Sequence, residues 1–238
     1  MARTPAGERT DRKRLEDTVF CAVDLETTGL SSLSRIVEVG AVRFRVGEEG
    51  ESFQRLVDPC CSIPYGAGRV HGITDDMVAG APRAPEVLAE LFAFARDGVI
   101  VAHNARYDTM ILSTELERAG MEMPPNDVVC TIKAAKHFLP RLPNYRLQTV
   151  TEALSIDPGE AHRALSDAES ARSIFEKAVT RVPAWRETPL SRVLEHCSSP
   201  RVGSGAGRGP EAPGEVDEAR LAIEEARLAI EEAIDRGS

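Results

Sequence analysis

The chain has 238 residues, 42% of them hydrophobic, which is enough to bury the core of one domain with room for appended segments. No apolar run approaches the roughly 20 residues that a membrane-spanning helix requires, so we expect no membrane association. The basic residues near the N-terminus have no apolar stretch behind them, so we expect no signal peptide there.

The net charge of −9 is concentrated near the C-terminus, where nine acidic residues from residue 211 onward face only three arginines. The rest of the chain is nearly balanced, so its charge does not exclude a polyanionic partner such as nucleic acid. The five cysteines form an odd set without CxxC spacing, which favours a protein of the reducing cytoplasm.

Hydrophobic patterns in the first 182 residues predict a mixed sheet with helices on both faces, an α/β fold. Strand-like runs at 19–24, 35–44 and 52–57 predict an antiparallel meander, because a glycine-containing turn at 47–50 joins the last two. The elements expected after the meander are strands at 99–102 and 128–132 and helices at 85–94, 107–119, 147–154 and 164–179.

The segments outside this region have a different composition. Residues 1–16 are predicted to be a disordered arm, and 183–214 a connecting segment with a Gly/Ser/Pro-rich linker. Residues 215–238 contain the sequence EARLAIE twice in tandem, which predicts a charged helix with a short coiled-coil-like stripe. That helix is either a solvated surface helix or a binding element for a protein partner.

Two carboxylates end the first predicted strand. Asp24 and Glu26 are two residues apart, so both side chains point to one face of the strand. Buried like charges persist when protons, basic partners or metal ions neutralise them, and this segment contains no Lys or Arg. A divalent metal is therefore the candidate partner, and the alternative is a strand that ends in a solvated acidic turn.

Two later acids interrupt the apolar stripes of predicted helices. Asp108 is in line with Leu112, and Asp167 is in line with Ala171. Each acid is near the start of its helix, so interaction with the helix dipole is the alternative explanation. Because both stripes should face the sheet that carries the first two acids, the four together predict a site for two Mg²⁺ or Mn²⁺ ions.

His162 precedes Asp167 by five residues, a separation that would place the two side chains about 140° apart on one continuous helix. We therefore expect His162 on the loop that enters the helix, where it could act as a general base because its pKa is near neutral. The alternative is a solvated loop histidine.

These residues lie within three motifs that resemble those of the DEDDh family of 3′–5′ exonucleases. The motifs are VDLETTG at 23–29, AHNARYD at 102–108 and AHRALSDA at 161–168, in the order typical of the family. Three further strings resemble the proofreading ε-subunit branch of bacterial DNA polymerase III: RIVEVGAVRF at 35–44, VHGIT at 70–74 and NYRLQTV at 144–150. The resemblance covers about 18–179, with Tyr107 where Phe is commoner.

The resemblance implies a ribonuclease H-like exonuclease domain at 17–182 that removes nucleotides from a 3′ end with two metal ions. By motif position, Asp24 would bridge the ions, Glu26 and Asp167 would complete the ion nearer the attacking water, and Asp108 would support the other. His162 would be the general base. The residues expected near the terminal nucleotide are Thr28, His71 and Asn104, although His71 could instead brace its own loop.

The sequence therefore predicts a cytoplasmic 3′–5′ exonuclease that releases nucleoside monophosphates from single-stranded DNA in proofreading or repair. One alternative keeps the chemistry and changes the substrate to RNA or short oligoribonucleotides, because a pocket that senses a 2′-hydroxyl is not evident from sequence. The other is a catalytically silent binding or scaffold module that recruits a partner through the terminal helix. All five catalytic positions carry competent residues, which favours the enzyme.

Overall fold

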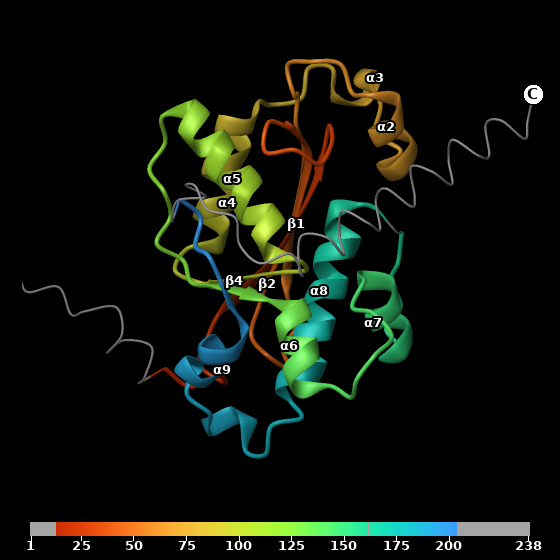
Figure 1. Cartoon of the computed structure of the whole chain (residues 1–238). Coiled ribbons are helices and arrows are strands. Elements are labelled where there is room, and N and C mark those ends of the chain that lie inside the picture. The colour runs from red at the N-terminus through yellow and green to blue at the C-terminus, as the bar shows by residue number, and fades with distance from the viewer. Residues whose placement is uncertain (1–12, 161, 204–238) are drawn as a thin grey trace, which may run out of the picture. The chain divides into compact units, whose positions relative to one another are not determined.

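The computed structural model describes residues 13–160 and 162–203, and its centre is a six-stranded sheet in the order β3-β2-β1-β4-β5-β6 (Figure 1). The strands are β1 Phe20–Thr27, β2 Ile36–Phe44, β3 Glu51–Leu56, β4 Val99–Ala102, β5 Val128–Cys130 and β6 Ser198–Ser199. The first three form the antiparallel meander, β1, β4 and β5 are parallel, and β6 is antiparallel to β5. The predicted mixed α/β sheet is therefore confirmed.

The strand β1 is central because both of its faces are covered. Phe20 and Ala22 belong to one hydrophobic cluster, and Cys21, Val23 and Leu25 belong to the other. A strand that is apolar on both faces is typical of a sheet enclosed between helices. The alternation of side chains fixes the direction of the acids that end the strand.

Helices cover both faces, with α4 and α5 on one side of the sheet and α6, α7 and α8 on the other (Figure 1). The helices are α2 Tyr65–His71, α3 Asp75–Val78, α4 Ala84–Ala95, α5 Ala105–Ala119, α6 Thr131–Phe138, α7 Leu147–Ala153, α8 Ala164–Val179 and α9 Leu190–Cys197, with a short 3-10 helix, η1, at Trp185–Glu187. In the described part of the chain, no helix is long and apolar enough to cross a bilayer.

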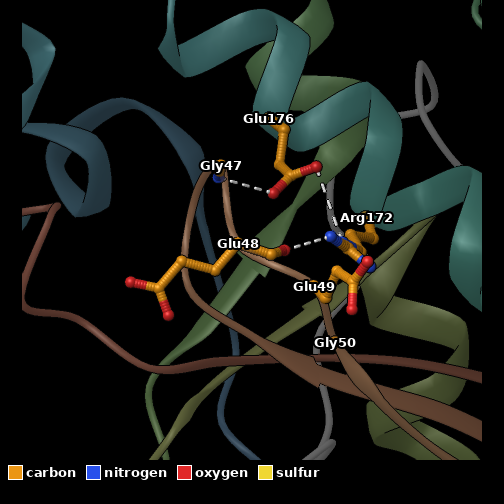
Figure 2. Close-up of a pocket in the computed structure, with 6 residues that line it drawn as sticks. All are labelled: Gly47, Glu48, Glu49, Gly50, Arg172 and Glu176. Carbon is orange, nitrogen blue, oxygen red and sulfur yellow. Dashed lines mark hydrogen bonds and ion pairs between the residues drawn. The ribbon is translucent and has the colours of Figure 1, made fainter.

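The helix α8 is fixed to the β2–β3 hairpin by polar contacts as well as by its apolar face. Figure 2 shows Arg172 and Glu176 of α8 against the hairpin turn. The amide of Gly47 donates to the Glu176 carboxylate at 3.0 Å, and the Arg172 guanidinium donates to the carbonyl of Glu48. The same guanidinium lies over the ring of Phe44, at 5.1 Å from the ring centroid.

The folded region extends beyond both predicted boundaries. Leu15 is fully buried, and its amide donates to the carbonyl of Thr188 at 2.9 Å. Downstream, α9 and β6 pack against the sheet, and Val202 is buried in the cluster that contains α4 and α5. Short segments with one or two apolar anchors do not stand out in a sequence pattern. Residues 1–12 of the arm predicted at 1–16, the linker from residue 204 onward and the helix predicted at 215–238 lie outside the described residues.

Several elements differ from the sequence prediction. The strand predicted at 128–132 ends at Cys130, because α6 begins directly at Thr131. The helices α2, α3, α6 and α9 were not predicted, since each has eight residues or fewer, which is shorter than the window in which a helical period is recognised. The two-residue strand β6, which adds a sixth strand beside β5, was not predicted either.

Gly40 of β2 is the point at which the start of α8 meets the sheet. It pairs with Asp24 of β1, and a methyl group at Gly40 would overlap the backbone of Ala164 and Leu165. Only a residue without a side chain permits this backbone contact. The first turn of α8 is therefore held beside the end of β1.

We predict that Gly40→Ala destabilises the fold, because the added methyl group must displace the first turn of α8. The expected loss is about 1–3 kcal/mol of unfolding free energy, typical of overpacking, measured by urea denaturation. Gly66→Ala is the matched control, since a methyl group there meets no atom within 4 Å. Equal stability of the two variants would contradict the close contact at Gly40.

Candidate active site

The end of β1 carries the first two candidate acids. Asp24 and Glu26 lie on the face of β1 that also carries Phe20 and Ala22, the face covered by α8. Both acids are partly exposed, whereas Leu25 between them is buried on the opposite face. The strand thus delivers two carboxylates to one side of the sheet at its carboxyl end.

The start of α8 brings two more candidate residues to the same place. Asp167 is in the first turn of the helix, and His162 is on the loop before it. One potential ligand atom from each of Glu26, His162 and Asp167 lies within 4.8 Å of the other two. His162 is exposed and has a φ of 58°, a left-handed conformation that costs a residue other than glycine on the order of 1 kcal/mol. Such strain is commonly found at functional sites.

Asp108 reaches the site from the other layer of helices. The helix α5 begins at Ala105, three residues after β4 ends, and Asp108 in its first turn is only 4% exposed. It lies close enough to Asp24 for its charge to raise the pKa of that carboxyl group. The structure thus gathers all four candidate acids and the histidine at one edge of the sheet.

The four carboxyl groups have raised pKa values, and burial is the largest cause for each. The pKa of Asp24 is well above its ordinary value, with further contributions from the charges of Asp108 and Asp167. The pKa values of Glu26 and Asp108 are raised to about 8. The pKa of Asp167 is raised to about 6, although the nearby His162 acts to lower this pKa. The site therefore holds more negative charge than its protein surroundings neutralise.

Sequence analysis missed one charged residue beside these acids. Glu38 of β2 is fully buried directly opposite Glu26 in the β1–β2 register. Burial acts to raise its pKa, but hydrogen bonds from Arg163 and from the amide of Ala164 hold the pKa below its ordinary value. The available signal was a single acid in the otherwise apolar strand IVEVGAV.

The predicted substrate residues Thr28 and Asn104 lie in the two turns that flank the acids. Thr28 is part of a tight turn, because its Oγ1 accepts a hydrogen bond from the amide of Arg35 at 2.9 Å and its own amide donates to the carbonyl of Arg35. Asn104 occupies the N-cap position of α5 in a left-handed conformation, with a φ of 58°, and its side chain caps no amide of the helix. Both residues are partly exposed.

His71, the third predicted substrate residue, is 5% exposed at the end of α2. Its Nδ1 accepts a hydrogen bond from the amide of Ile73 at 3.0 Å, which braces the following turn as the alternative interpretation expected. Its Nε2 is buried and has no hydrogen-bond partner among the described residues. Burial lowers the pKa of His71, while the backbone of Thr27 and the charge of Glu38 act to raise it. His71 therefore belongs to the surroundings of the acids.

Tyr107, which replaces the commoner Phe, fixes the turn after β1. Its hydroxyl lies 2.7 Å from Oγ1 of Thr27 and 2.7 Å from the carbonyl of Gly29, to which it donates. Burial raises the pKa of this phenol to about 12, so it keeps its proton at neutral pH. A phenylalanine could not make either bond, so Tyr107 adds a polar link between α5 and the turn that carries Thr28.

The mixed sheet with helices on both faces is the ribonuclease H-like fold that the resemblance implied, and the candidate acids lie at the end of its central strand. Residues 21–175 match the family described as exonuclease. The chain therefore belongs to the exonuclease family, an enzyme family, as the motif resemblance predicted.

Similar proteins agree with this assignment. A PolC-type DNA polymerase III of Halalkalibacterium halodurans is 37% identical over 166 residues, which cover 69% of this chain and 12% of the polymerase. The chain thus corresponds to a small part of that relative. Two solved structures share the fold. The first, Exonuclease X in complex with 5′ overhanging duplex DNA, aligns with a TM-score of 0.58 and 24% identity over 71% of this chain and 96% of the Exonuclease X chain. The second, the nuclease domain of 3′hExo, a DEDDh family member bound to rAMP, aligns with a TM-score of 0.61 and 19% identity over 69% of this chain and 92% of the 3′hExo chain.

The carboxylate cluster fits a divalent metal ion on chemical grounds. Glu26, Asp167 and His162 offer oxygen and nitrogen ligands at close range, and hard cations prefer carboxylate oxygen. Burial is the largest cause of the raised pKa values of Asp24, Glu26 and Asp108, and neighbouring acids raise those of Asp24 and Glu26 further. A bound cation would supply positive charge and favour the ionised carboxylates.

We predict that the metal-free protein becomes less stable as the pH rises from about 5 to 8. In the folded protein, an acid with a raised pKa keeps a proton that the unfolded chain has already released at about pH 4. The free energy of unfolding therefore falls as the pH rises, until the folded pKa of about 8 is passed. The measurement is the melting temperature against pH in EDTA. Mn²⁺ at about 100 times its dissociation constant should restore about 2.7 kcal/mol at pH 8.

Glu26→Gln should reduce this pH slope, because it removes one of the acids with a raised pKa. Glu90→Gln is the control, since Glu90 pairs with Arg55 at the surface and both side chains are about half exposed. If the melting temperature falls with pH equally in the wild type and in both variants, Glu26 does not contribute to this pH dependence, and the prediction is wrong.

Proposed function

We propose that the chain is a metal-dependent 3′–5′ exonuclease that hydrolyses single-stranded DNA from its 3′ end and releases nucleoside monophosphates, in proofreading or repair. The observation that carries the proposal is the convergence of Glu26, His162 and Asp167 within 4.8 Å, beside Asp24 and Asp108. Acids at the end of a central strand, with a histidine on an exposed loop, provide metal ligands and a base at one place.

The residues proposed to hold two Mg²⁺ or Mn²⁺ ions are Asp24, Glu26, Asp108 and Asp167. When bound, the two ions would stabilise the attacking and leaving oxygens of the phosphodiester during in-line displacement. Aspartate and glutamate provide the oxygen ligands that both ions prefer. In the protein alone, burial raises the pKa values of Asp24 and Glu26, and the charges of neighbouring acids raise them further.

His162 is the proposed general base, which takes a proton from the water that attacks phosphorus. His162 is exposed, and its backbone makes a hydrogen bond to the Asp167 carboxylate. Thr28, His71 and Asn104 are proposed to contact the terminal nucleotide. The position of His71 supports this role, because its buried ring lies against the backbone of Thr27, next to Thr28.

DNA is the proposed substrate because the similar polymerases are DNA polymerases. RNA is the alternative, and the similar nuclease domain bound to rAMP supports it. The predicted helix at 215–238 remains a proposed binding element for a protein partner.

We predict that a single-stranded oligonucleotide labelled at its 5′ end is shortened one nucleotide at a time in the presence of Mg²⁺ or Mn²⁺. The readout is a gel time course, run with matched DNA and RNA strands and with EDTA as the metal-free control. DNA should be degraded faster than RNA, and a reversed preference would replace the proposed substrate. Immediate release of the labelled nucleotide, or cleavage of a circular strand, would exclude a 3′ exonuclease.

His162→Ala should lower the rate by about 10²–10⁴-fold, because it removes the general base. Its affinity for the oligonucleotide should stay close to that of the wild type, since the carboxylates and the turns around them remain. The measurement is single-turnover cleavage together with fluorescence anisotropy of the labelled strand. His137→Ala, an exposed histidine stacked on His196, is the control. An equal rate for both variants would remove His162 from the chemistry.

A further inference from the structure

A buried carboxylate connects β2 to the loop that carries His162. Glu38 is fully buried, and its Oε1 accepts hydrogen bonds from Gln54 at 2.9 Å and from Nη2 of Arg163 at 2.7 Å. Its Oε2 accepts from Nε of Arg163 at 3.2 Å and from the amide of Ala164 at 3.0 Å. Both carboxylate oxygens of Glu38 therefore accept hydrogen bonds from Arg163, and Oε2 also accepts one from the first amide of α8.

Arg163 is the residue that directly follows His162. Two parallel bonds between a guanidinium and a carboxylate fix the orientation of both groups, unlike a single contact to an ammonium. The Arg163 side chain is 26% exposed and the Glu38 side chain 0%, so the carboxylate is the buried anchor. The backbone at 163 and 164 is thereby attached to β2, and His162 extends from this attachment in a left-handed conformation.

The position of this ion pair in the sheet relates it to the site. Glu38 faces Glu26 across the β1–β2 register, so the anchor and a candidate metal ligand stand on neighbouring strands at the same level. A buried ion pair adds little net stability, because removing both charges from water offsets their attraction. In some proteins such a pair instead fixes a geometry, and here it attaches the residue next to His162 to the strand that faces Glu26.

We propose that Glu38 and Arg163 are positioning residues that hold His162 over the carboxylate cluster, an inference that rests on the proposed function of His162 as the base. The competing explanation is that the pair only docks α8 on the sheet. Under that explanation, its loss would lower stability and metal binding without a specific effect on the step that needs His162.

Arg163→Lys is the variant of choice because it keeps the charge beside Glu38 but cannot make the paired bonds from Nε and Nη2. Arg172→Lys is the matched control: Arg172 is on the same helix, is 21% exposed, and contacts the β2–β3 hairpin away from the site. Both variants of the full chain are compared with the wild type by melting temperature and by Mn²⁺ titration calorimetry. Equal Mn²⁺ affinity shows that the carboxylate cluster is intact.

The kinetic readout is hydrolysis of the nitrophenyl ester of thymidine 5′-monophosphate with Mn²⁺, which separates kcat from KM. Arg163→Lys should lose about 10- to 100-fold in kcat, the scale expected for a displaced catalytic group, with KM within about twofold of the wild type. Arg172→Lys should keep the wild-type kcat. In a His162→Ala background, Arg163→Lys should cause no further loss, because residues that act through one another are not additive.

A full additional loss in the His162→Ala background, or an unchanged kcat in Arg163→Lys, would overturn the inference and leave the proposed function standing. An inactive wild type would instead refute the proposed function. For that case, the ring signals of ¹⁵N-histidine-labelled protein still test the positioning, with His162 assigned by its absence in His162→Ala. Arg163→Lys should shift or broaden this signal and Arg172→Lys should not; an unmoved signal counts against the inference.

Discussion

The contact between the first turn of α8 and the backbone of β2 is the constraint on which the site depends. Asp24 and Glu26 belong to β1, whereas Asp167 lies in α8 and His162 on the loop before it, more than 130 residues later in the chain. They meet because Gly40 leaves room for the helix backbone and because Glu38 bonds the amide of Ala164. A side chain at 40 or an apolar residue at 38 would separate the two halves of the site.

This contact brings together groups that repel one another. The acids at the carboxyl end of β1 are partly desolvated, and the charges of neighbouring acids raise the pKa values of Asp24 and Glu26 further. The fold tolerates that repulsion because the large apolar clusters on both faces of the sheet stabilise the same arrangement. Local disagreement between charge and burial is expected where a protein binds a charged ligand or carries out chemistry.

Sequence patterns predicted the parts of the molecule that contrast with their surroundings. Asp24, Asp108 and Asp167 each interrupt an apolar strand or stripe, so their direction could be inferred from the period of the element. Glu38 interrupts an apolar strand in the same way, but its partner Arg163 is 125 residues away, and no local pattern reveals that pairing. Gly40 could not be interpreted for a similar reason, since its significance lies in the close approach of a distant helix. The unpredicted helices are short, and tertiary packing rather than periodicity stabilises them.

The two-residue strand β6 has a consequence for where the chain can be divided. It pairs with β5 and covers an otherwise open edge of the sheet, while α9 behind it buries Val193 and Cys197. The family match ends at residue 175, so a fragment cut there would expose the edge of β5 and the apolar surface beneath α9. Uncovered strand edges promote pairing between chains and aggregation. The folded part of this protein is therefore longer than the segment that the family model matches, and it includes the stretch up to Val202 that closes the sheet.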